Sequence, residues 1–563
     1  MEVSPPDQVA TPEPPGGTAT AAKLSGRRWL GALAGPQAGA DRRFPAAVGV
    51  GSFLVLAAVL LARNAYLFTT KIYENADFAA NTIAVLQAKH FHLLTGDYSK
   101  DQFYHPGPAF LYVMAGGESL FHDALHVVPT PWNGQLLAIL LLNAVLIAAT
   151  LALLATHAGA RRVALACLLV VLVFVAVHPL TVNSGWLSYV YFAPTLLLLV
   201  SGASVATGRT AALPLLALSA SLCIHGQAEF LLFAPATVLL ALAGLVAAHR
   251  HDLRDMFRGN AWHWAGAGVV AALFALPIAL YTVRHWPGEF GLYLKYRHNV
   301  SAHHLIHHSL SFSARYTLRY WWPGIPTTNA DIGGRYVAVA LAIVALLLAL
   351  RCPVPSLRRF LLWSLAMAGL MTVLFVYYAQ TAIGDKEIKQ TYVGYFYWAV
   401  PLLVLMVAVA GAAVYLPRRR AAAVALAVTA AAAAVVATVV PQHQDNRNDP
   451  QAKYLGVPQL PQLVHTFATA ANGRPIVLRI NDGAWFDAVG VVAYADRTGV
   501  RSCVVGSKAW GVLFRSQSIC TQSEIQTGIP FWFSPSGQPV VTGQVAVARL
   551  PQALVTRQLP ATK

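Results

Sequence analysis

Charged residues are scarce in this sequence: Asp, Glu, Lys and Arg make up 11% of its 563 residues, against about 25% in a typical globular domain. A soluble protein of this length would need well-charged surfaces, so the scarcity argues against that class. Hydrophobic residues instead make up 56% of the chain, and they occur in runs of roughly 20 residues, enough to cross a bilayer. The sequence therefore predicts a polytopic α-helical membrane protein, because helices pair their own backbone polar groups in lipid.

Ionisable residues are also absent from the middle of every long apolar run. Transporters coupled to protons or ions usually keep such residues near the bilayer midplane, so their absence argues against transport.

No cleavable signal peptide is evident, because the first run starts near Phe44 after a polar tail. We expect eleven spans, at 46–68, 133–156, 163–180, 189–206, 211–226, 228–248, 262–283, 335–350, 358–379, 393–416 and 421–440.

Basic residues fall on alternate sides of these spans, which sets an orientation. They occur in the tail 1–45 and in every second loop, where the series is Arg161, Arg162, Arg209, Arg250, Arg254, Arg258, Arg351, Arg358, Arg359, Arg418, Arg419 and Arg420. By the positive-inside rule the N-terminus is cytoplasmic, and an odd number of spans places 441–563 outside. The net charge of +17 thus reflects topology rather than nucleic-acid binding. Abundant alanine and an excess of arginine over lysine suggest a bacterial plasma membrane.

Cysteine is rare, with five residues in the chain. Cys503 and Cys520 are the only two in the region beyond 441. In an oxidising compartment they are candidates for a disulfide, although two cysteines can also share a region without pairing. Cys167, Cys223 and Cys352 are more simply explained as packing residues.

The region 441–563 differs from the rest in character. A polar linker is followed by a buried strand at 474–480, an amphipathic helix at 484–499 and a second strand at 501–506. Strand–helix–strand at this spacing predicts an α/β domain, with "FWFS" and "QVAVARL" as later strands. It lacks the glycine pattern GxGxxG after the first strand, which argues against nucleotide binding.

Unusual sequence collects in the predicted outer loops, chiefly 69–132 and 284–334. The first loop contains "KIYENADFAANTIAVLQAKHF" (71–91), where Glu74 and Asp77 precede an amphipathic helix expected to lie in the membrane interface. Residues 96–121 predict a second surface helix or a partly embedded one, because glycines and Glu118 interrupt the stretch. The simplest interpretation of Glu74 and Asp77 is that they are solvated charges at a helix N-terminus.

The layout of the whole chain resembles the GT-C glycosyltransferases, integral-membrane enzymes that use polyprenyl-phosphate-linked sugars. The local matches are "ENAD" (74–77) and "FYHPGP" (103–108), where Gly107 departs from the commoner doubled proline. The resemblance implies that Asp77 is the general base of an inverting transfer, with Glu74 assisting it, binding an acceptor hydroxyl or helping to hold a divalent metal. It also implies that the terminal domain covers the active-site cavity or holds the acceptor.

A departing polyprenyl phosphate needs cations or hydrogen-bond donors at its oxygens. Two outer loops supply them among aromatic residues, 292–322 and 385–398, although ordinary interfacial anchoring explains such residues equally well. The candidates for phosphate binding are Arg297 and Lys389 first, then Lys386, Lys295 and His105. Glu229 and His225, in the outer hairpin 223–230, are candidates for a second acidic group facing the same cavity.

The one cofactor that the sequence leaves open is a divalent metal ion, Mg²⁺ or Mn²⁺. His303, His304, His307 and His308 form two i,i+4 pairs, but a polar surface face is favoured there over a metal site. The expected partners are a polyprenyl-phosphate-linked sugar, the lipid bilayer and an acceptor that is a glycan, glycolipid or protein. The alternatives to a glycosyltransferase are a ligase or polymerase of lipid-linked glycans, dominated by loop 284–334, and a transporter or flippase.

Overall fold

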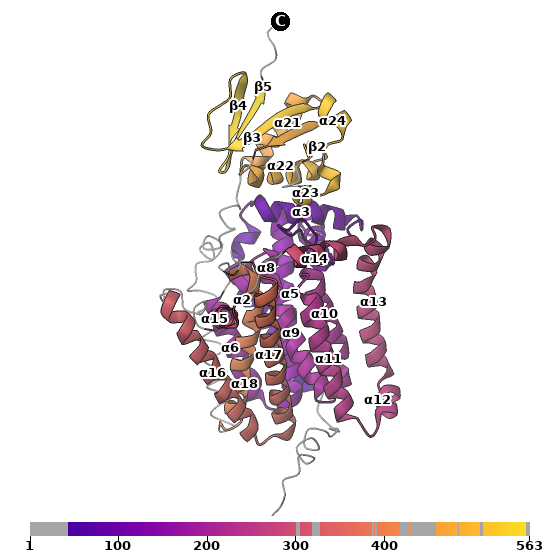
Figure 1. Ribbon diagram of the computed structural model, residues 1–563, viewed down its shortest axis with the longest axis vertical. Helices are drawn as coiled ribbons and strands as arrows, with labels where there is room; N and C mark the ends of the chain where they lie inside the picture. The colour runs from indigo at the N-terminus through magenta and orange to yellow at the C-terminus, as the bar shows by residue number, and fades with distance from the viewer. Residues whose placement is uncertain are drawn as a thin grey trace, which may run out of the picture.

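The computed structural model describes residues 43–178, 180–299, 304–317, 327–384, 388, 391–416, 428, 458–481, 483–506 and 511–558. These residues form a long helical bundle with a small α/β domain stacked on one end (Figure 1). We call this the domain end of the bundle and the opposite one the far end.

The bundle holds the helices that are long and apolar enough to cross a membrane. By length and composition eight described segments qualify: Arg43–Arg63 (α2), Pro131–Ala158 (α5), Leu187–Ala206, Phe230–Ala248 (α11), Ala261–Arg284 (α13), Gly334–Arg351, Pro355–Thr381 (α17) and Tyr392–Ala413. Two further predicted spans correspond to the shorter α6 (Arg161–Val177) and the segment Thr210–Gly226. The expected multi-pass helical architecture is confirmed, while the eleventh predicted span, 421–440, lies outside the described residues apart from 428.

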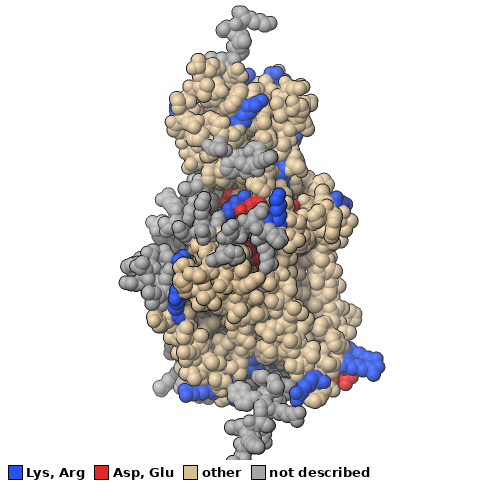
Figure 2. Space-filling model, viewed as in Figure 1, with Lys and Arg blue, Asp and Glu red and all other residues tan. Residues whose placement is uncertain are grey.

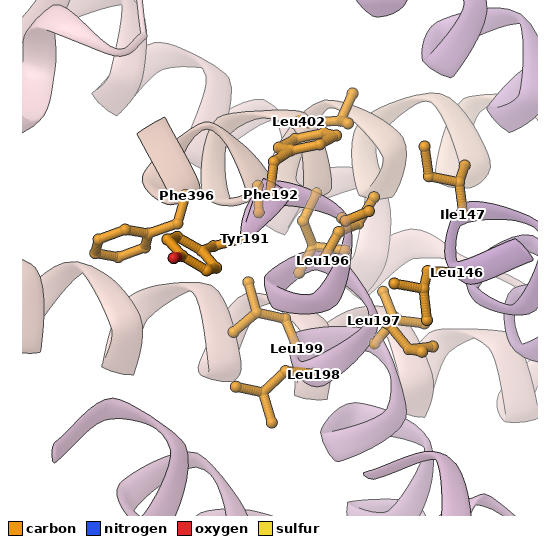
Figure 3. Close-up of a cluster of buried hydrophobic side chains, with 14 of the residues drawn as sticks. Leu146, Ile147, Tyr191, Phe192, Leu196, Leu197, Leu198, Leu199, Phe396 and Leu402 are labelled. Carbon is orange, nitrogen blue, oxygen red and sulfur yellow. The ribbon is translucent and has the colours of Figure 1, made fainter. Parts of the chain in front are cut away.

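Helix α9 (Phe192–Ala206) is the centre of the bundle, and all of its residues are buried. Its sequence is apolar on every side, which is typical of a helix surrounded by other helices. Its leucines and Phe192 interdigitate with side chains of neighbouring helices, as Figure 3 shows. Helix α9 packs against α5, α10 (Leu213–Gly226), α11 and α17.

The remaining bundle elements are shorter or lie at its edge. Helix α13 has no buried residue and stands apart in Figure 1, packing mainly on α10. The other bounds are η1 (Ala65–Phe68), α7 (Leu180–Asn183), α8 (Leu187–Val190), η3 (Thr210–Ala212), α12 (Leu253–Gly259), α14 (Gly288–Asn299), α15 (Ile306–Arg315), α16 (Thr327–Arg351), η5 (Thr391–Trp398) and α18 (Ala399–Ala413).

The first long loop folds into two helical pieces at the domain end. The first is α3 (Ala76–Lys89), and the second is α4 (Ala109–Gly117) continued by a π-helical turn, η2 (Glu118–Ala124). Nine residues of α4 are too few to span a bilayer, in agreement with the predicted surface or partly embedded helix. Helix α4 packs on α5 and α3 instead.

The terminal domain is built on a five-stranded sheet of order β2-β1-β3-β5-β4. Strand β1 (Ile476–Ile480) runs parallel to β2 (Ser502–Val504) and β3 (Ile529–Pro535), while β5 (Ala553–Gln558) pairs antiparallel with β3 and β4 (Gln544–Arg549). The predicted strand–helix–strand unit is confirmed, with α22 (Trp485–Arg497) as its helix. Strand β5 was not predicted from the sequence. The other helices are α21 (Leu460–Ala471), α23 (Gly511–Phe514), η7 (Ser516–Ser518) and α24 (Gln522–Thr527).

The terminal domain contains the disulfide that the cysteine count suggested. Cys503 in β2 is bonded to Cys520, with the Cα atoms 4.9 Å apart. The bridge joins the end of β2 to the segment after η7, where the backbone N–H of Cys520 donates to the carbonyl of Val504. The three other cysteines are buried and free, as expected for packing residues.

Helix α3, which was expected to be an amphipathic helix in the membrane interface, contributes to two hydrophobic cores. Phe78 and Val85 pack in the core of the bundle, whereas Ala79 and Ile83 pack in the core of the terminal domain, against α22. The sequence pattern of α3 was compatible with a surface helix, because the face toward the terminal domain consists largely of alanines. The domain covers that face, so α3 is buried on both sides.

Candidate functional site

A cavity of about 830 Å³ lies at the domain end of the bundle, between the helices and the terminal domain. On the face drawn in Figure 2, most of the visible acidic side chains gather at this junction. Its polar and aromatic lining includes Asp77, Asp97, Tyr98, Lys100, Asp101, His105, Trp186, Tyr191, Gln227, Glu229, Tyr293, Tyr296, Tyr377, Tyr378, Tyr392 and Trp485. The first long loop, the loop after α13 and the terminal domain all contribute, as the sequence led us to expect of an active-site cavity.

Asp77 faces this cavity from the first turn of α3. The hydroxyl of Tyr98 donates to its carboxylate, and Trp186 provides a second side-chain hydrogen bond. Burial raises the pKa of Asp77, although both hydrogen bonds oppose the shift. The carboxyl group is therefore more basic than a solvated one and is held in a fixed position, which suits a group that accepts a proton.

The backbone next to Asp77 is strained. Ala76 has a φ of +49° although it carries a side chain, and it is fully buried. Such a conformation costs of order 1–3 kcal/mol and persists only where the surroundings enforce it. The terminal domain packs directly against this part of the chain. A side chain at Gly490 of α22 would lie 2.7 Å from Oδ1 of Asn75, so glycine lets the two backbones approach closely.

Asp97 is a second carboxyl group in the cavity, and the sequence analysis missed it. Burial raises its pKa to about 7, with a further upward contribution from the charge of Asp77. The backbone N–H of Tyr98 and the charge of Arg515 oppose the shift. Asp97 lies within "GDYSKDQFYHPGP", a polar stretch between two apolar helices, but nothing local distinguishes its carboxyl group from that of Asp101.

The segment carrying Asp97 is a small hairpin. The backbone N–H of Gly96 donates to the carbonyl of His105, the N–H of His105 donates to the carbonyl of Asp97, and Tyr98 bridges to Tyr104. These pairings hold the carboxyl group of Asp97 and the ring of Tyr98 on one rigid unit. The hairpin is thus the structural link between the two aspartates.

Arg515, from the terminal domain, holds this hairpin from above. Its guanidinium donates to the hydroxyl of Thr95 at 3.1 Å and to the carbonyl of Gly96 at 2.6 Å, and it lies 4.6 Å from the ring centroid of Tyr104. Arg515 itself has a φ of +56°, another strained position. The terminal domain therefore shapes the wall of the cavity, and sequence reasoning had no signal for this arginine.

Helix α14 holds the same hairpin from the side. A carboxylate oxygen of Glu289 accepts the backbone N–H of Tyr104 at 2.8 Å, and the other accepts the hydroxyl of Tyr281 at 3.0 Å. The hydroxyl of Tyr293 donates to the carbonyl of Tyr104. Loop 284–334 thus reaches the cavity through α14, where Tyr293 and Tyr296 belong to the lining.

His105 and His225 have separate positions. His105 lines the cavity, and burial lowers its pKa to about 4, so the ring is neutral and accepts the backbone N–H of Ala228 at 3.2 Å. A neutral ring brings no positive charge to a phosphate. His225 does not line the cavity. It packs against Gly107, where a side chain would lie 2.2 Å from its Nδ1 atom, which explains the glycine in "HPGP".

Glu229 lines the cavity as the sequence analysis suggested. Its Oε1 atom accepts the hydroxyl of Tyr378 at 2.7 Å, whereas its Oε2 atom and Oε1 of Gln227 have no hydrogen-bond partner among the described residues. Burial raises the pKa of Glu229. Both oxygens are themselves buried, although the two residues belong to the lining.

Glu74 is placed differently from the expectation that it assists Asp77. It is buried away from the cavity lining, where it accepts from the hydroxyl of Thr82 at 2.8 Å and pairs with Arg497 of α22 at 3.0 Å. Arg497 also pairs with the buried Glu118 at 3.0 Å. Glu74 is only three positions before Asp77, but it precedes the start of α3. Because the chain at Asn75 is extended, the two carboxylates point to different neighbours.

Of the Lys and Arg residues proposed for phosphate binding, Lys295 is the one whose side chain is described. Lys295 is exposed on α14 and does not line the cavity. The side chain of Arg297 and the residues Lys386 and Lys389 lie outside the described part of the chain. Lys100 is the only Lys or Arg among the described lining residues, and the sequence analysis did not select it.

A metal ligand set was open from the sequence, with Glu74 as one candidate. Within the described ranges, no three His, Cys, Asp or Glu side chains are grouped to hold one ion. His303 lies outside the described residues, and Nε2 of His304 contacts the carbonyl of Ile383 at 2.8 Å. A requirement for Mg²⁺ or Mn²⁺ therefore remains a prediction without a defined site.

Comparison with known proteins identifies the architecture. No protein-family model and no curated protein matches the sequence. Among solved structures, the chain is similar to ArnT from Cupriavidus metallidurans in the apo state, with a TM-score of 0.53 and 14% identity over 89% of this chain and 97% of ArnT. It is also similar to the same protein bound to undecaprenyl phosphate, with a TM-score of 0.54 and 13% identity over 90% and 98%. The chain therefore has the fold of ArnT, which agrees with the layout that the sequence analysis described.

Proposed function

We propose that this protein is a glycosyltransferase that moves a sugar from a polyprenyl-phosphate donor to an acceptor in the cavity at the domain end. The observation that carries the proposal is the convergence of Asp77 and Asp97 on one cavity, in a fold shared with a protein solved with undecaprenyl phosphate. The acceptor is a glycan, a glycolipid or a protein. From the distribution of basic residues, the domain end faces outside and the N-terminus is cytoplasmic.

In this mechanism Asp77 is the general base. Its carboxylate takes the proton of an acceptor hydroxyl as the hydroxyl oxygen attacks the anomeric carbon of the donor sugar. The bond from that carbon to the phosphate oxygen breaks on the opposite side, so the configuration inverts and polyprenyl phosphate leaves with the electron pair. Help of this kind is worth about 10²–10⁴-fold in rate. Tyr98 and Trp186 keep the carboxylate aimed at one point.

The other lining residues have complementary roles in the proposal. Lys100 pairs with the phosphate that leaves, since a cation stabilises the charge that develops there. Gln227 and Glu229, which line the cavity, bind sugar hydroxyls. The terminal domain completes the cavity, because Trp485, Val512 and Leu513 belong to its lining.

The test replaces Asp77 by Asn in the full chain and measures release of undecaprenyl phosphate from a panel of undecaprenyl-phosphate-linked sugars in membranes. We expect a loss of at least 100-fold with normal membrane insertion. Asp123→Asn is the matched control, because Asp123 is an exposed acid of the same loop outside the cavity. Transfer at the wild-type rate by Asp77→Asn would refute the proposed base. If Asp77→Asn kept the wild-type rate and Tyr296→Phe in α14 abolished transfer, the proposal would be replaced by a ligase or polymerase centred on loop 284–334.

A further inference from the structure

A second cavity, of about 330 Å³, lies at the far end of the bundle, away from the terminal domain. It forms where the ends of α5, α11 and α17 meet the turn before η3 and the start of α13. The side chains and backbone that line it are His157, Thr207, Gly208, Arg209, Thr210, Ala211, Ala248, His249, Asn260, His263, Ser356 and Arg359. None of these residues takes part in the site described above.

The lining of this cavity is positively charged. Arg209 and Arg359 both contribute to it, together with three histidines, and no Asp or Glu occurs among the described lining residues. Asp252 lies 3.7 Å from Nδ1 of His249 but does not line the cavity. Partial burial, followed by the charge of Arg359, lowers the pKa of Arg209. Two neighbouring guanidinium groups repel each other because both are positively charged, and an anion bound between or beside them reduces this repulsion.

The groups around the two arginines are fixed by contacts within the protein. The Nη2 atom of Arg209 donates to the carbonyl of Thr156 at 2.8 Å, and Nε2 of His249 contacts the carbonyl of Gly208 at 3.0 Å. Gly208 has a φ of +100°, and a side chain there would lie 3.2 Å from that same imidazole nitrogen. Nδ1 of His263 contacts the hydroxyl of Thr210 at 3.0 Å. The cavity is thus preorganised rather than a loose gap between helix ends.

We infer that this far-end cavity binds a phosphate group, either the headgroup phosphate of an anionic lipid or a free phosphate ion. Guanidinium groups present several N–H donors in a fixed plane that matches phosphate oxygens. The imidazoles of His249 and His263 and the hydroxyl of Thr210 contact groups within the protein, so the two guanidinium groups carry the inferred binding. The position at the ends of membrane-spanning helices, on the side rich in arginine, places the cavity at the level of lipid headgroups. The inference does not depend on the proposed glycosyltransferase activity.

The experiment uses the full chain in non-ionic detergent and two binding measurements. Native mass spectrometry compares the affinity for phosphatidylglycerol with that for phosphatidylcholine, and thermal unfolding compares potassium phosphate with potassium chloride at equal ionic strength. The test variant is Arg209→Gln with Arg359→Gln. The control is Arg254→Gln with Arg258→Gln, which removes the same charge from exposed positions of α12 at the same end. Arg209→Lys with Arg359→Lys keeps the charge but removes the planar donors.

We expect the test variant to lose at least tenfold in affinity for one of the two probes, while the control stays within twofold of the wild type. The lysine variant should lose severalfold, and it serves in place of the glutamine variant if that one fails to fold. Loss confined to phosphatidylglycerol identifies a lipid headgroup, and loss of stabilisation by potassium phosphate identifies a free ion. Equal binding by wild type, lysine and glutamine variants would overturn the inference, as would an equal loss in the control.

Discussion

Asp97 lines the cavity, and burial raises its pKa to about 7. The folded protein keeps the proton of Asp97 up to that pH, whereas the unfolded chain gives it up near pH 4. The stability cost of this carboxyl group therefore grows between pH 4 and 7 and persists above pH 7. Asp97→Asn should raise the melting temperature at pH 8 and leave it almost unchanged at pH 4.

Asp123 is a control of opposite sign for this measurement. Partial burial acts to raise the pKa of Asp123, but hydrogen bonds from Lys89 and His122 outweigh it and lower this pKa. Its contribution to stability is present above about pH 4 and is lost on acidification. Asp123→Asn should therefore slightly lower the melting temperature at pH 8. A rise in both variants, or in neither, would contradict the assigned environment of Asp97.

A second prediction at the scale of single residues concerns the close contact between Gly107 and the ring of His225. A side chain there would meet the ring of His225 at 2.2–2.5 Å, so Gly107→Ala should destabilise the protein by about 1–3 kcal/mol, the usual cost of overpacking. Gly116→Ala is the matched control, because the space around Gly116 is open. Adding His225→Ala to Gly107→Ala should cost less than the sum of the single changes. Thermal unfolding measures all four variants, and additive costs would show that the contact is not the cause.

At the scale of elements, the contact between α3 and α22 rests on a buried ionic cluster. Arg497 is 10% exposed and faces Glu74 and Glu118, which are 8% and 2% exposed. Removing one partner of a buried pair typically costs about 3–5 kcal/mol, because the other charges stay buried. Arg497→Gln should therefore loosen the terminal domain and speed hydrogen exchange of the α3 amides.

Arg501→Gln provides the comparison for this element. Arg501 pairs with Glu524 at the surface of the same domain and is 50% exposed, and such pairs contribute about 0–1 kcal/mol. Exchange in α3 should be unchanged in this variant. Faster exchange after both substitutions would mean that loss of any charge from the domain suffices, which the buried cluster does not explain.

The sequence predicted the elements whose burial depends on their own composition, and it missed features that depend on contacts between distant segments. The spans and the strand–helix–strand unit followed from local hydropathy, because each segment's own composition decides its burial. Asp77 could be selected through the resemblance of the chain's layout to the GT-C glycosyltransferases, whereas its local sequence favoured a solvated charge. Asp97 could not, since its environment depends on Arg515, which holds Thr95 across 420 positions of sequence. The burial of α3 was missed for the same reason.

At the scale of the whole molecule, the orientation in the membrane is testable with single cysteines. Gln538 is exposed in the turn between β3 and β4, and Arg254 is exposed at the far end. In intact cells, a membrane-impermeant maleimide should label Gln538→Cys, and it should label Arg254→Cys only after permeabilisation. The three free cysteines are buried, so the unsubstituted chain gives the background. Labelling of Arg254→Cys alone in intact cells would invert the orientation.

The double burial of α3 has a consequence for biosynthesis. Asn75, just before α3, donates to Asp487 of α22, which follows 412 positions later in the chain. At about 5–20 residues per second, α22 is made roughly 20 to 80 s after α3. During that interval the outer face of α3 and the loop that carries Asp97 lack the domain that covers them. The cavity at the domain end is therefore completed last, and we expect a chain truncated before residue 485 to insert its helices without forming it.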